Sequence, residues 1–209
     1  MIEFNAIALL RRRAATSCQL PLAEGQRFLE MHESDKARLV QAYRANGMSG
    51  KPERLQRRYD HGMRCFAIEE GERLVAWFWA LHGVPRYMDE FAWQIPLNET
   101  QVWLRDAFVV PERRGRRLLL AMMGAGVTVE STPMEYFSDV SVSNRPSLRA
   151  HAAMGFSRFA TVHSLRFGGS RWWRSLPPEG LPAPAQLRPD QKHLRMSADE
   201  IAWHHAQIA

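Results

Sequence analysis

The feature that most constrains this chain is a buried-strand pattern that leads through a tight turn into an apolar helix pattern. The strand pattern covers residues 101–110, and the helix pattern runs from residue 116 to about residue 129. The first N–H groups of a helix have no partner within the helix, and the helix dipole adds partial positive charge there. Because such a helix start binds phosphate through its main chain, the sequence predicts a pyrophosphate site at this turn.

Four arginines surround this turn: Arg113, Arg114, Arg116 and Arg117. Guanidinium groups stay charged and form paired hydrogen bonds with phosphate. All but three of the 28 Lys and Arg residues are arginine, and the formal net charge is +6. That excess permits a nucleic-acid partner. It does not require one, because the arginines are dispersed, no recognition motif is present, and a solvated surface also explains the charge.

Length and composition place the chain among globular proteins with a sizeable core. The 209 residues suffice for one domain with an appendage, and the hydrophobic fraction of 45% and charged fraction of 24% are ordinary. Cys18 and Cys65 match no metal-binding spacing, so we expect two reduced thiols and no metal. We expect no signal peptide and no membrane span, because the start lacks a basic segment and no apolar run approaches roughly 18 residues. These features predict a cytoplasmic protein.

The rest of the pattern mixes strands and helices. Strands are predicted at residues 2–10, 64–69, 74–81, 134–142 and 156–167, with a shorter one at residues 91–95. The strands at 64–69 and 74–81 form a hairpin. Helices are predicted at residues 52–59 and 145–154, with one or two more between residues 22 and 45. Trp77 and Trp79 share one strand face, which is either a packed aromatic face or the wall of a substrate site.

The composition changes at Gly168. Prolines and glycines then predict an extended segment, and residues 197–208 are predicted to form a last helix with Ser197 as its N-cap. The chain is therefore expected to contain a domain over residues 1–167 and a Pro-rich C-terminal extension over residues 168–209. Because Trp172, Trp173 and Trp203 are costly to expose, the extension either lies over the domain or contacts a partner chain, which leaves a homodimer open.

Two motifs resemble the GNAT superfamily of acyl-CoA-dependent N-acyltransferases. Residues 109–118 (VVPERRGRRL) are similar to that family's pyrophosphate-binding turn. Residues 142–156 (VSNRPSLRAHAAMGF) are similar to its helix between an Asn and a Gly-Phe pair, near the cofactor's exit. The predicted hairpin precedes both motifs, as it does in the family. The resemblance implies an α/β (α+β) fold with a mixed, mostly antiparallel central sheet, flanking helices and splayed central strands.

The resemblance also implies a donor substrate, acetyl-CoA or another acyl-CoA, whose pantetheine arm lies between the splayed strands. It assigns main-chain contacts with this arm to Phe108 and Val109. Asn144 is a further contact by resemblance, and a helix-cap role alone also explains it. The resemblance assigns the pyrophosphate to six residues of the turn: Arg114, Gly115, Arg116, Arg117, Leu118 and Leu119.

Two positions of the turn depart from the family. Arg117 stands where the family usually has Gly, and Leu119 stands where it usually has Gly or Ala. Small residues let the main chain approach a phosphate closely. These departures leave the donor open between acetyl-CoA, a longer acyl-CoA and an acyl group on a carrier protein.

The implied reaction is direct attack of a neutral amine on a thioester, which needs a base for the amine's proton. The resemblance points to Asp106 as this base, and a structural pairing with a nearby Arg is the alternative. His151 stands seven residues after Asn144, where the family often has a tyrosine that protonates the leaving thiolate. A histidine donates a proton near neutral pH, and the alternative is a residue that lines the channel without proton transfer. Asp139, in the next predicted strand, is a weaker candidate. Asp89 and Glu90 lie in a loop that can border the acceptor site, where they either act on the acceptor, bind a cationic acceptor or are merely solvated.

Three functions are compatible with these features. The leading hypothesis is an N-acyltransferase, in the simplest case an N-acetyltransferase, that acts on the primary amine of a small molecule or a protein. The second is a nucleic-acid-binding or tRNA-directed protein that uses its arginines on phosphates. The third is a degenerate GNAT domain that binds CoA or a partner without turnover, and its support is Arg117 and Leu119 alone. The sequence carries no motif for the acceptor.

Overall fold

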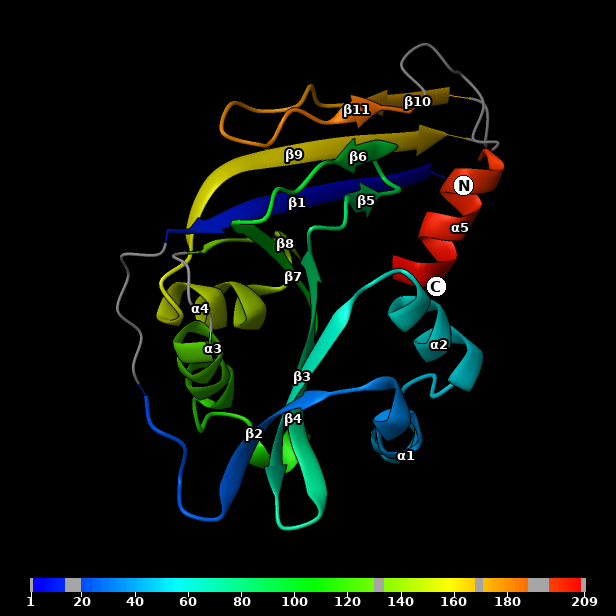
Figure 1. The fold of residues 1–209 in the computed structure, drawn as a ribbon. Helices are drawn as coiled ribbons and strands as arrows, with labels where there is room; N and C mark the ends of the chain where they lie inside the picture. The colour runs from blue at the N-terminus through cyan, green and yellow to red at the C-terminus, as the bar shows by residue number, and fades with distance from the viewer. Residues whose placement is uncertain (1, 14–19, 130–133, 168–170, 188–195, 208–209) are drawn as a thin grey trace.

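The chain folds around a twisted eight-stranded sheet with helices on both sides (Figure 1). The computed structural model describes residues 2–13, 20–129, 134–167, 171–187 and 196–207. The strand order is β10-β9-β1-β8-β7-β4-β3-β2. The bounds of these strands are β1 Ile2–Arg12, β2 Gln26–Met31, β3 Arg64–Glu70, β4 Arg73–His82, β7 Gln101–Val109, β8 Glu135–Ser141, β9 Ser157–Phe167 and β10 Arg171–Arg174.

Within the described strands of this sheet, β7 and β8 run parallel and the other neighbouring pairs are antiparallel. The predicted mixed, mostly antiparallel sheet is therefore confirmed. The predicted hairpin is also present as β3 and β4, and Gly71 in the turn between them has a φ of 64°. A second, three-stranded sheet contains β5 (Arg86–Met88), β6 (Trp93–Ile95) and β11 (Ala185–Gln186).

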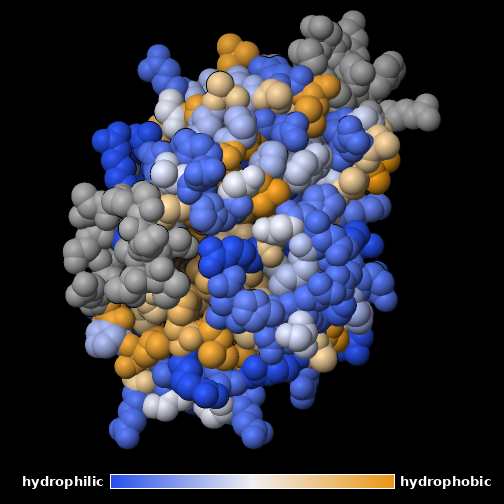
Figure 2. Space-filling view, viewed as in Figure 1, coloured by the Kyte–Doolittle hydropathy of each residue, from blue (hydrophilic) through white to orange (hydrophobic). Residues whose placement is uncertain are grey.

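In the residues that the structure describes, five α-helices and two short 3-10 helices accompany the sheets: η1 Glu33–Asp35, α1 Lys36–Ala45, α2 Pro52–Asp60, η2 Pro111–Arg113, α3 Leu118–Val129, α4 Arg145–Ala153 and α5 Ala198–Gln207. α3 and α4 lie on one side of the sheet, and α1, α2 and α5 lie on the other (Figure 1). The surface over α1, α2 and α5 is mostly hydrophilic in Figure 2, so these helices bury one face only. In the described part of the chain, no helix is long and apolar enough to cross a membrane.

The alternation of side chains along β4 separates the two sides of the core. Trp77 and Trp79 are fully buried and face α1 and α2, where their rings lie 5.4 Å from Tyr43 and 5.1 Å from Tyr59, measured between ring centroids. Phe78 points the opposite way and lines a small cavity with residues of α3. The prediction that the two tryptophans share one face is confirmed.

The largest departure from the sequence-based expectation is β2, which lies inside the segment predicted as one or two helices. β2 pairs with β3, so that Phe28 lies opposite Ile68. The ring of Phe28 also stacks on Phe66, with 5.6 Å between centroids. Pairing with the sheet edge and burial of one aromatic face override the weak helical periodicity of this segment. The second half of the segment forms α1, as predicted.

The C-terminal extension packs on the rest of the chain. β10 extends the main sheet by pairing with β9, β11 pairs with β6, and α5 contacts α2 and β5. Ser197 caps α5 as predicted, since its Oγ accepts a 3.2 Å hydrogen bond from the N–H of Glu200. Trp203 contacts the ring of His61, whereas Trp173 is 57% exposed. The side chain of Trp172 lies outside the described residues.

The described cysteine is a core residue. Cys65 is fully buried on β3, and burial raises the pKa of its thiol far above the ordinary range. A thiol in this state is unreactive. Cys18 lies outside the described residues, so the structure gives no account of it.

Candidate functional site

The site is organised by a gap that opens between β7 and β8. These strands pair in parallel over only four positions, from Gln101 opposite Glu135 to Leu104 opposite Ser138. Among the described strands, β7 pairs with β4 alone beyond Leu104, and β8 pairs with β1 alone beyond Ser138. The main-chain groups of β7 that would bond to β8 therefore face an open space. The splayed central strands predicted from the sequence are present.

A β-bulge in β7 lies at the start of this gap. Arg105 pairs with Trp79 and Phe108 pairs with Trp77, so two residues of β7 face one residue of β4. Asp106 is the first of these two residues and has a φ of 49°, in the left-handed region. A bulge of this kind bends the strand and redirects its side chains. The bulge thus turns Asp106 and Ala107 away from the regular ladder.

A cleft of about 250 Å³ occupies the gap, and we call it the splay cleft. β7 and β8 form two of its walls, α3 contributes Leu119 and Met123, and α4 contributes the residues that close the far end. The full lining is Phe78, Leu104, Arg105, Asp106, Ala107, Leu119, Met123, Ser138, Asp139, Val140, Ser141, Asn144, Ser147, His151 and Met154. This cleft lies between two strands that have parted, a position that suits an extended ligand laid along them.

The arginine turn connects β7 to the start of α3, beside the splay cleft. Gly115 and Arg117 both have positive φ angles, of 77° and 57°. Arg117 therefore adopts a left-handed conformation, which glycine adopts most easily. This is the position where the GNAT superfamily, which the sequence resembles, usually has Gly. α3 begins at Leu118, so the amides of Leu118 and Leu119 belong to the first turn of the helix. The predicted phosphate-binding residues thus lie together at one helix start.

The four arginines of the turn have different surroundings. The Nε atom of Arg113 lies 3.2 Å from both carboxylate oxygens of Glu70, so its charge is neutralised. Arg114, Arg116 and Arg117 are exposed, and no carboxylate of the described residues lies within ion-pair distance of them. The Nε atom of Arg114 donates to the carbonyl oxygen of Val109 at 3.2 Å, and its guanidinium lies over the Phe108 ring. Three guanidinium groups are therefore available to an anion.

Asn144 and His151 border the splay cleft from α4. The Oδ1 atom of Asn144 accepts a 3.2 Å hydrogen bond from the N–H of Ser147, which is the helix-cap contact. The Nδ1 atom of His151 lies 2.8 Å from the carbonyl oxygen of Ser147 and must donate to it. The Nε2 atom of His151 then accepts from the Ser138 hydroxyl, 3.0 Å away. Burial lowers the pKa of His151, so the ring is uncharged near neutral pH.

Asp106 forms an ion pair at the bulge. Its Oδ2 atom lies 2.5 Å from Nη2 of Arg58 on α2, and its Oδ1 atom lies 3.9 Å from Nη2 of Arg105. Burial acts to raise the pKa of Asp106, but Arg105 and Arg58 outweigh it, so the pKa is lowered. The carboxylate is consequently ionised near neutral pH.

Asp139 belongs to a separate buried network. It accepts hydrogen bonds of 3.1 Å from Nε and Nη2 of Arg86 and of 2.6 Å from Nε1 of Trp103. Burial favours the neutral acid, but Arg86 and Arg105 outweigh it and lower the pKa to about 2. Asp139 is held by these donors. Asp89 is likewise engaged, since Nη2 of Arg166 lies 3.4 Å from its Oδ2.

A second cleft, of about 330 Å³, lies on the other side of the bulge, and we call it the α2 cleft. It shares Asp106 and Ala107 with the splay cleft. Its lining is Tyr43, Met48, Ser49, Arg54, Arg58, Trp77, Asp106, Ala107 and Phe108. The bulge is therefore the point where two clefts, one on each side of the sheet, meet.

Several residues of these clefts were not among the sequence-based candidates. Ser138 is a buried hydroxyl with no motif of its own. Arg54 and Arg58 are four residues apart on α2 and hence share one helix face. That spacing was the available signal, but α2 is so polar throughout that the sequence does not mark which arginines face inward.

Solved structures with this arrangement include acetyltransferases. A GNAT-family acetyltransferase from Colwellia psychrerythraea matches with a TM-score of 0.53 and 12% identity, over 79% of this chain and 55% of that chain. A GCN5-related glucosamine N-acetyltransferase region of a fungal multi-domain GH3 β-N-acetylglucosaminidase matches with a TM-score of 0.55 and 15% identity, over 80% of this chain and 21% of that chain. This chain has the GNAT fold. A functionally unknown conserved protein from Staphylococcus epidermidis also matches, with a TM-score of 0.57, 8% identity and coverage of 79% of this chain and 62% of that one.

At these identities the likeness establishes the GNAT fold alone. No protein-family model matches the sequence, and no curated protein matches it significantly. The aligned part of this chain spans less than two thirds of the length of each of these solved structures. The likeness therefore does not extend to activity, substrates or partners.

Proposed function

We propose that this chain is an acyl-CoA-dependent N-acyltransferase that moves an acyl group, in the simplest case acetyl, from CoA to a primary amine by direct attack. The observation that carries the proposal is the parting of β7 and β8 beyond Leu104 and Ser138, directly beside the arginine turn. An extended thioester arm fits the first feature and a pyrophosphate fits the second. Nucleic-acid binding does not use the strand gap, and only turnover distinguishes the enzyme from a GNAT domain that binds CoA without reaction.

The donor is proposed to bind along the splay cleft with its pyrophosphate at the start of α3. The amides of residues 115–119 supply main-chain donors, since the N–H of Arg114 already donates to the carbonyl oxygen of Pro111, and three exposed arginines add positive charge. Phe108 and Val109 lie on the stretch of β7 that no longer pairs with β8, and we assign them the main-chain contacts with the pantetheine arm, although the carbonyl oxygen of Val109 also accepts from Nε of Arg114. Asn144 borders the same cleft, and its helix cap holds the loop that ends β8. The acyl group then reaches the bulge.

The acceptor is proposed to enter from the α2 cleft, so that its nitrogen meets the acyl carbon at Asp106 and Ala107. The nitrogen forms a bond to the acyl carbon, the carbon–sulfur bond breaks, and the thiolate departs. Asp106 is the carboxylate common to both clefts, so we assign it the proton that the amine loses. Its lowered pKa makes it a modest base, so its second task is to hold the acceptor's ammonium at the bulge before deprotonation.

His151 is proposed to line the splay cleft without transferring a proton. Both of its ring nitrogens are engaged, and its lowered pKa leaves it uncharged. Its bond to Ser138 fixes the position where the parallel ladder ends. A thiolate whose conjugate acid has a pKa of about 8–9 departs without an enzymatic acid, so the mechanism does not need an imidazolium at this position.

Donor binding is tested by thermal unfolding with and without acetyl-CoA. A ligand that binds the folded state raises the midpoint by mass action, so acetyl-CoA at a concentration well above its Kd should raise it. Arg116→Ala should weaken this binding by about tenfold, because it removes one exposed charge-assisted contact with phosphate. Arg158→Ala removes an exposed arginine from β9 and serves as the matched control. No shift with any acyl-CoA would contradict CoA as the donor.

Turnover is tested with acetyl-CoA and a panel of primary amines, read as thiol release. Amine-dependent release supports the N-acyltransferase. Binding of acetyl-CoA without release by any amine favours the degenerate GNAT domain. Strong RNA binding with a steep salt dependence, together with no response to acyl-CoA, favours the nucleic-acid hypothesis.

A further inference from the structure

A small cavity adjoins the splay cleft on the side of α3, and we call it the α3 cavity. Phe78, Leu104 and Met123 line both spaces, so the splay cleft and the α3 cavity meet at these three side chains. Val102 and Tyr136, which lie opposite each other in the parallel ladder of β7 and β8, also line the cavity. The cavity therefore lies over the paired part of the two strands, directly beyond the end of the gap.

The end of the gap decides which way a long acyl chain can turn. A chain that follows the gap cannot continue between β7 and β8 past Leu104 and Ser138, because the ladder closes there. It must leave the sheet on the side of α2 or on the side of α3. The α2 cleft presents the charged side chains of Arg58 and Asp106. An apolar chain is therefore better accommodated on the side of α3, provided that the walls of the cavity are apolar.

The two ionisable side chains of the α3 cavity are engaged with other partners. Nε and Nη2 of Arg64 donate to the two carboxylate oxygens of Glu30, at 2.7 and 2.9 Å. Nε2 of His82 lies 2.9 Å from the carbonyl oxygen of Glu99. The other described residues of the lining are Phe66, Phe78, Ala80, Val102, Leu104, Met123, Gly126 and Tyr136. These walls suit an uncharged chain, and a terminal carboxylate would meet an arginine whose charge is already balanced.

The volume of the α3 cavity limits the length of the chain. The cavity measures about 30 Å³, and a water-sized group needs about 10–15 Å³ on this scale. The space therefore holds roughly two groups of the size of a methylene or methyl. Met123, at the border with the splay cleft, has a flexible and unbranched side chain that adapts to an entering group. An acetyl group extended by one or two carbons fits this space.

We propose that the α3 cavity is an acyl-chain site and that propionyl-CoA and butyryl-CoA are better donors than acetyl-CoA. The inference rests on the proposed function for the position of the thioester. It goes beyond that function because it names the donor's chain, which is linear, uncharged and three or four carbons long. Donor binding needs no acceptor, so this preference can be measured apart from turnover.

The test measures the Kd of the full chain for acetyl-, propionyl-, butyryl-, octanoyl- and succinyl-CoA by calorimetry. Each methylene that enters the cavity should tighten binding by about three- to fourfold, so butyryl-CoA should bind about tenfold more tightly than acetyl-CoA. Octanoyl-CoA should gain nothing over butyryl-CoA, and succinyl-CoA should bind no more tightly than acetyl-CoA. Equal binding of acetyl- and butyryl-CoA, a continued gain up to octanoyl-CoA, or tightest binding of succinyl-CoA overturns the proposal.

A variant in the cavity locates the chain. Ala80 lies two residues after Phe78 on β4, so both side chains face the α3 cavity. Ala80→Val should lower the affinity for butyryl-CoA by about fivefold or more and leave the affinity for acetyl-CoA unchanged, because only the longer chain needs the filled space. Ala152→Val, at an exposed position of α4, is the matched control and should change neither affinity. An equal effect of Ala80→Val on both donors, or no effect on either, contradicts an acyl-chain site here.

Gly126→Ala provides a second variant if Ala80→Val does not fold. Among the described residues, a Cβ at Gly126 meets Phe28 alone, at an ordinary 3.7 Å from its Cζ atom, and alanine favours a helix over glycine. The added methyl narrows the cavity, so the preference for butyryl-CoA should fall by about threefold. An unchanged preference in this variant contradicts the proposal.

The outcomes for the chain preference and for turnover are independent. If butyryl-CoA binds more tightly than acetyl-CoA but no amine gives thiol release, the proposed function fails and the acyl-chain site stands. If acetyl-CoA binds and reacts with an amine, but longer chains bind no better, the proposed function stands and the acyl-chain site fails. Absence of binding by every acyl-CoA contradicts both.

Discussion

The Oδ2 atom of Asp106 accepts a 2.5 Å hydrogen bond from Nη2 of Arg58, and this contact joins the bulge of β7 to α2. Arg58 is buried, whereas the side chain of Asp106 is 35% exposed toward the clefts. The pair therefore fixes a carboxylate at the border between two ligand spaces while one of its oxygens stays accessible. Two consequences follow, one for turnover and one for stability.

Asp106→Asn should lower turnover with acetyl-CoA and a competent amine by about 100-fold, because an amide cannot take a proton. Donor affinity should not change, since the turn that we propose to bind phosphate is elsewhere. The free energy of unfolding should fall by about 1–3 kcal/mol, because Arg58 keeps its charge and loses its charged partner. Steady-state kinetics and urea unfolding measure these effects. Unchanged turnover would remove Asp106 from the mechanism.

The same pair has a defined pH dependence. The pKa of Asp106 is lower in the folded chain than in the unfolded chain. Its contribution to stability is therefore complete above the unfolded pKa of about 3.9 and is lost as the pH falls toward the folded value. Asp60→Asn, which changes an exposed carboxylate on α2, is the control. The control variant should follow the wild-type stability curve below pH 5, whereas Asp106→Asn should be flatter.

His151→Gln should change the pH dependence of stability near neutrality. Burial lowers the pKa of His151 in the folded chain. Below about pH 6.5, the ordinary pKa of histidine, the unfolded chain therefore binds more protons at this residue than the folded chain does. Folding stability consequently falls as the pH is lowered from 7.5 to 5.5. Glutamine does not titrate, so the variant should lose less stability over that pH range, as measured by urea unfolding. His205→Gln, at an exposed position of α5, should behave like the wild type.

The kinetics of His151→Gln separate the two interpretations of this residue. A residue that only lines the splay cleft should leave turnover within about tenfold of the wild type, since Gln can still accept from the Ser138 hydroxyl. A fall of about 100-fold, together with loss of the pH dependence of kcat, would assign proton transfer to His151.

The strand, turn and helix around residues 101–129 could be predicted because their signals are local. A buried run, a turn with Gly115 and an apolar helix are each visible in a short window, and Ser197 marks the start of α5 in the same way. The contact between Arg58 and Asp106 could not be predicted, since the residues are 48 positions apart and nothing near either one marks the partner. β2 was missed for a related reason, because its conformation depends on pairing with β3. Long-range contacts determine both the Arg58–Asp106 pair and the conformation of β2.

Arg117 provides a test of the turn's geometry. Its φ of 57° is costly for a residue with a side chain, by about 1–2 kcal/mol, and this penalty is absent for glycine. Arg117→Gly should therefore be more stable than Arg117→Ala by about 1 kcal/mol, although glycine usually destabilises relative to alanine. Urea unfolding of the two variants measures the difference. If the alanine variant is the more stable, the left-handed conformation is wrong.

The same two variants separate main chain from side chain in donor binding. Both lack the guanidinium, and only the glycine variant holds the turn without strain. If the amides of the turn bind the pyrophosphate, the glycine variant should bind acetyl-CoA at least as tightly as the alanine variant. Tighter binding by the wild type than by both would show that the Arg117 guanidinium itself contacts phosphate.

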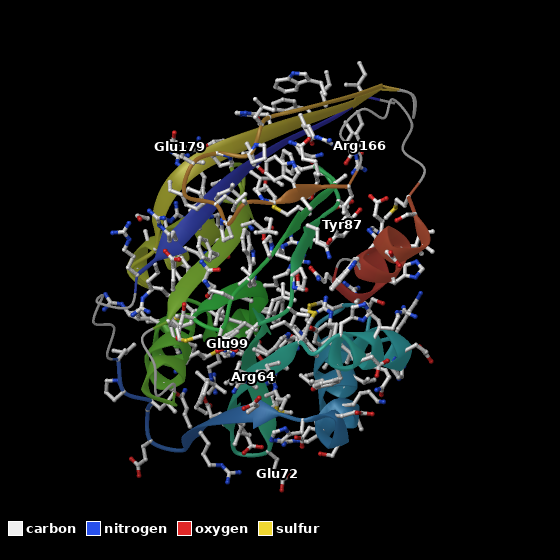
Figure 3. The ribbon with its side chains drawn as sticks, turned by 45° about the horizontal axis from the view of Figure 1, so that its top comes forward. Arg64, Glu72, Tyr87, Glu99, Arg166 and Glu179 are labelled. Atoms are coloured by element: carbon white, nitrogen blue, oxygen red, sulfur yellow. The ribbon has the colours of Figure 1, made fainter. Side chains whose placement is uncertain are left out.

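Gln207 fastens α5 to Tyr87 of β5, which is labelled near this helix in Figure 3. Its fully buried amide accepts from the N–H of Tyr87 and donates to the carbonyl oxygen of Pro85, each at 2.9 Å, and its own carbonyl accepts from Nη1 of Arg105 at 2.6 Å. Gln207→Ala should lower the free energy of unfolding by about 1–3 kcal/mol, because it removes the hydrogen bonds to the buried N–H of Tyr87 and the half-buried carbonyl of Pro85. Ile201→Ala, at an exposed site on the same helix, should cost much less. Hydrogen exchange of α5 should accelerate in Gln207→Ala alone; equal exchange in both variants would show that α5 is held by its other contacts.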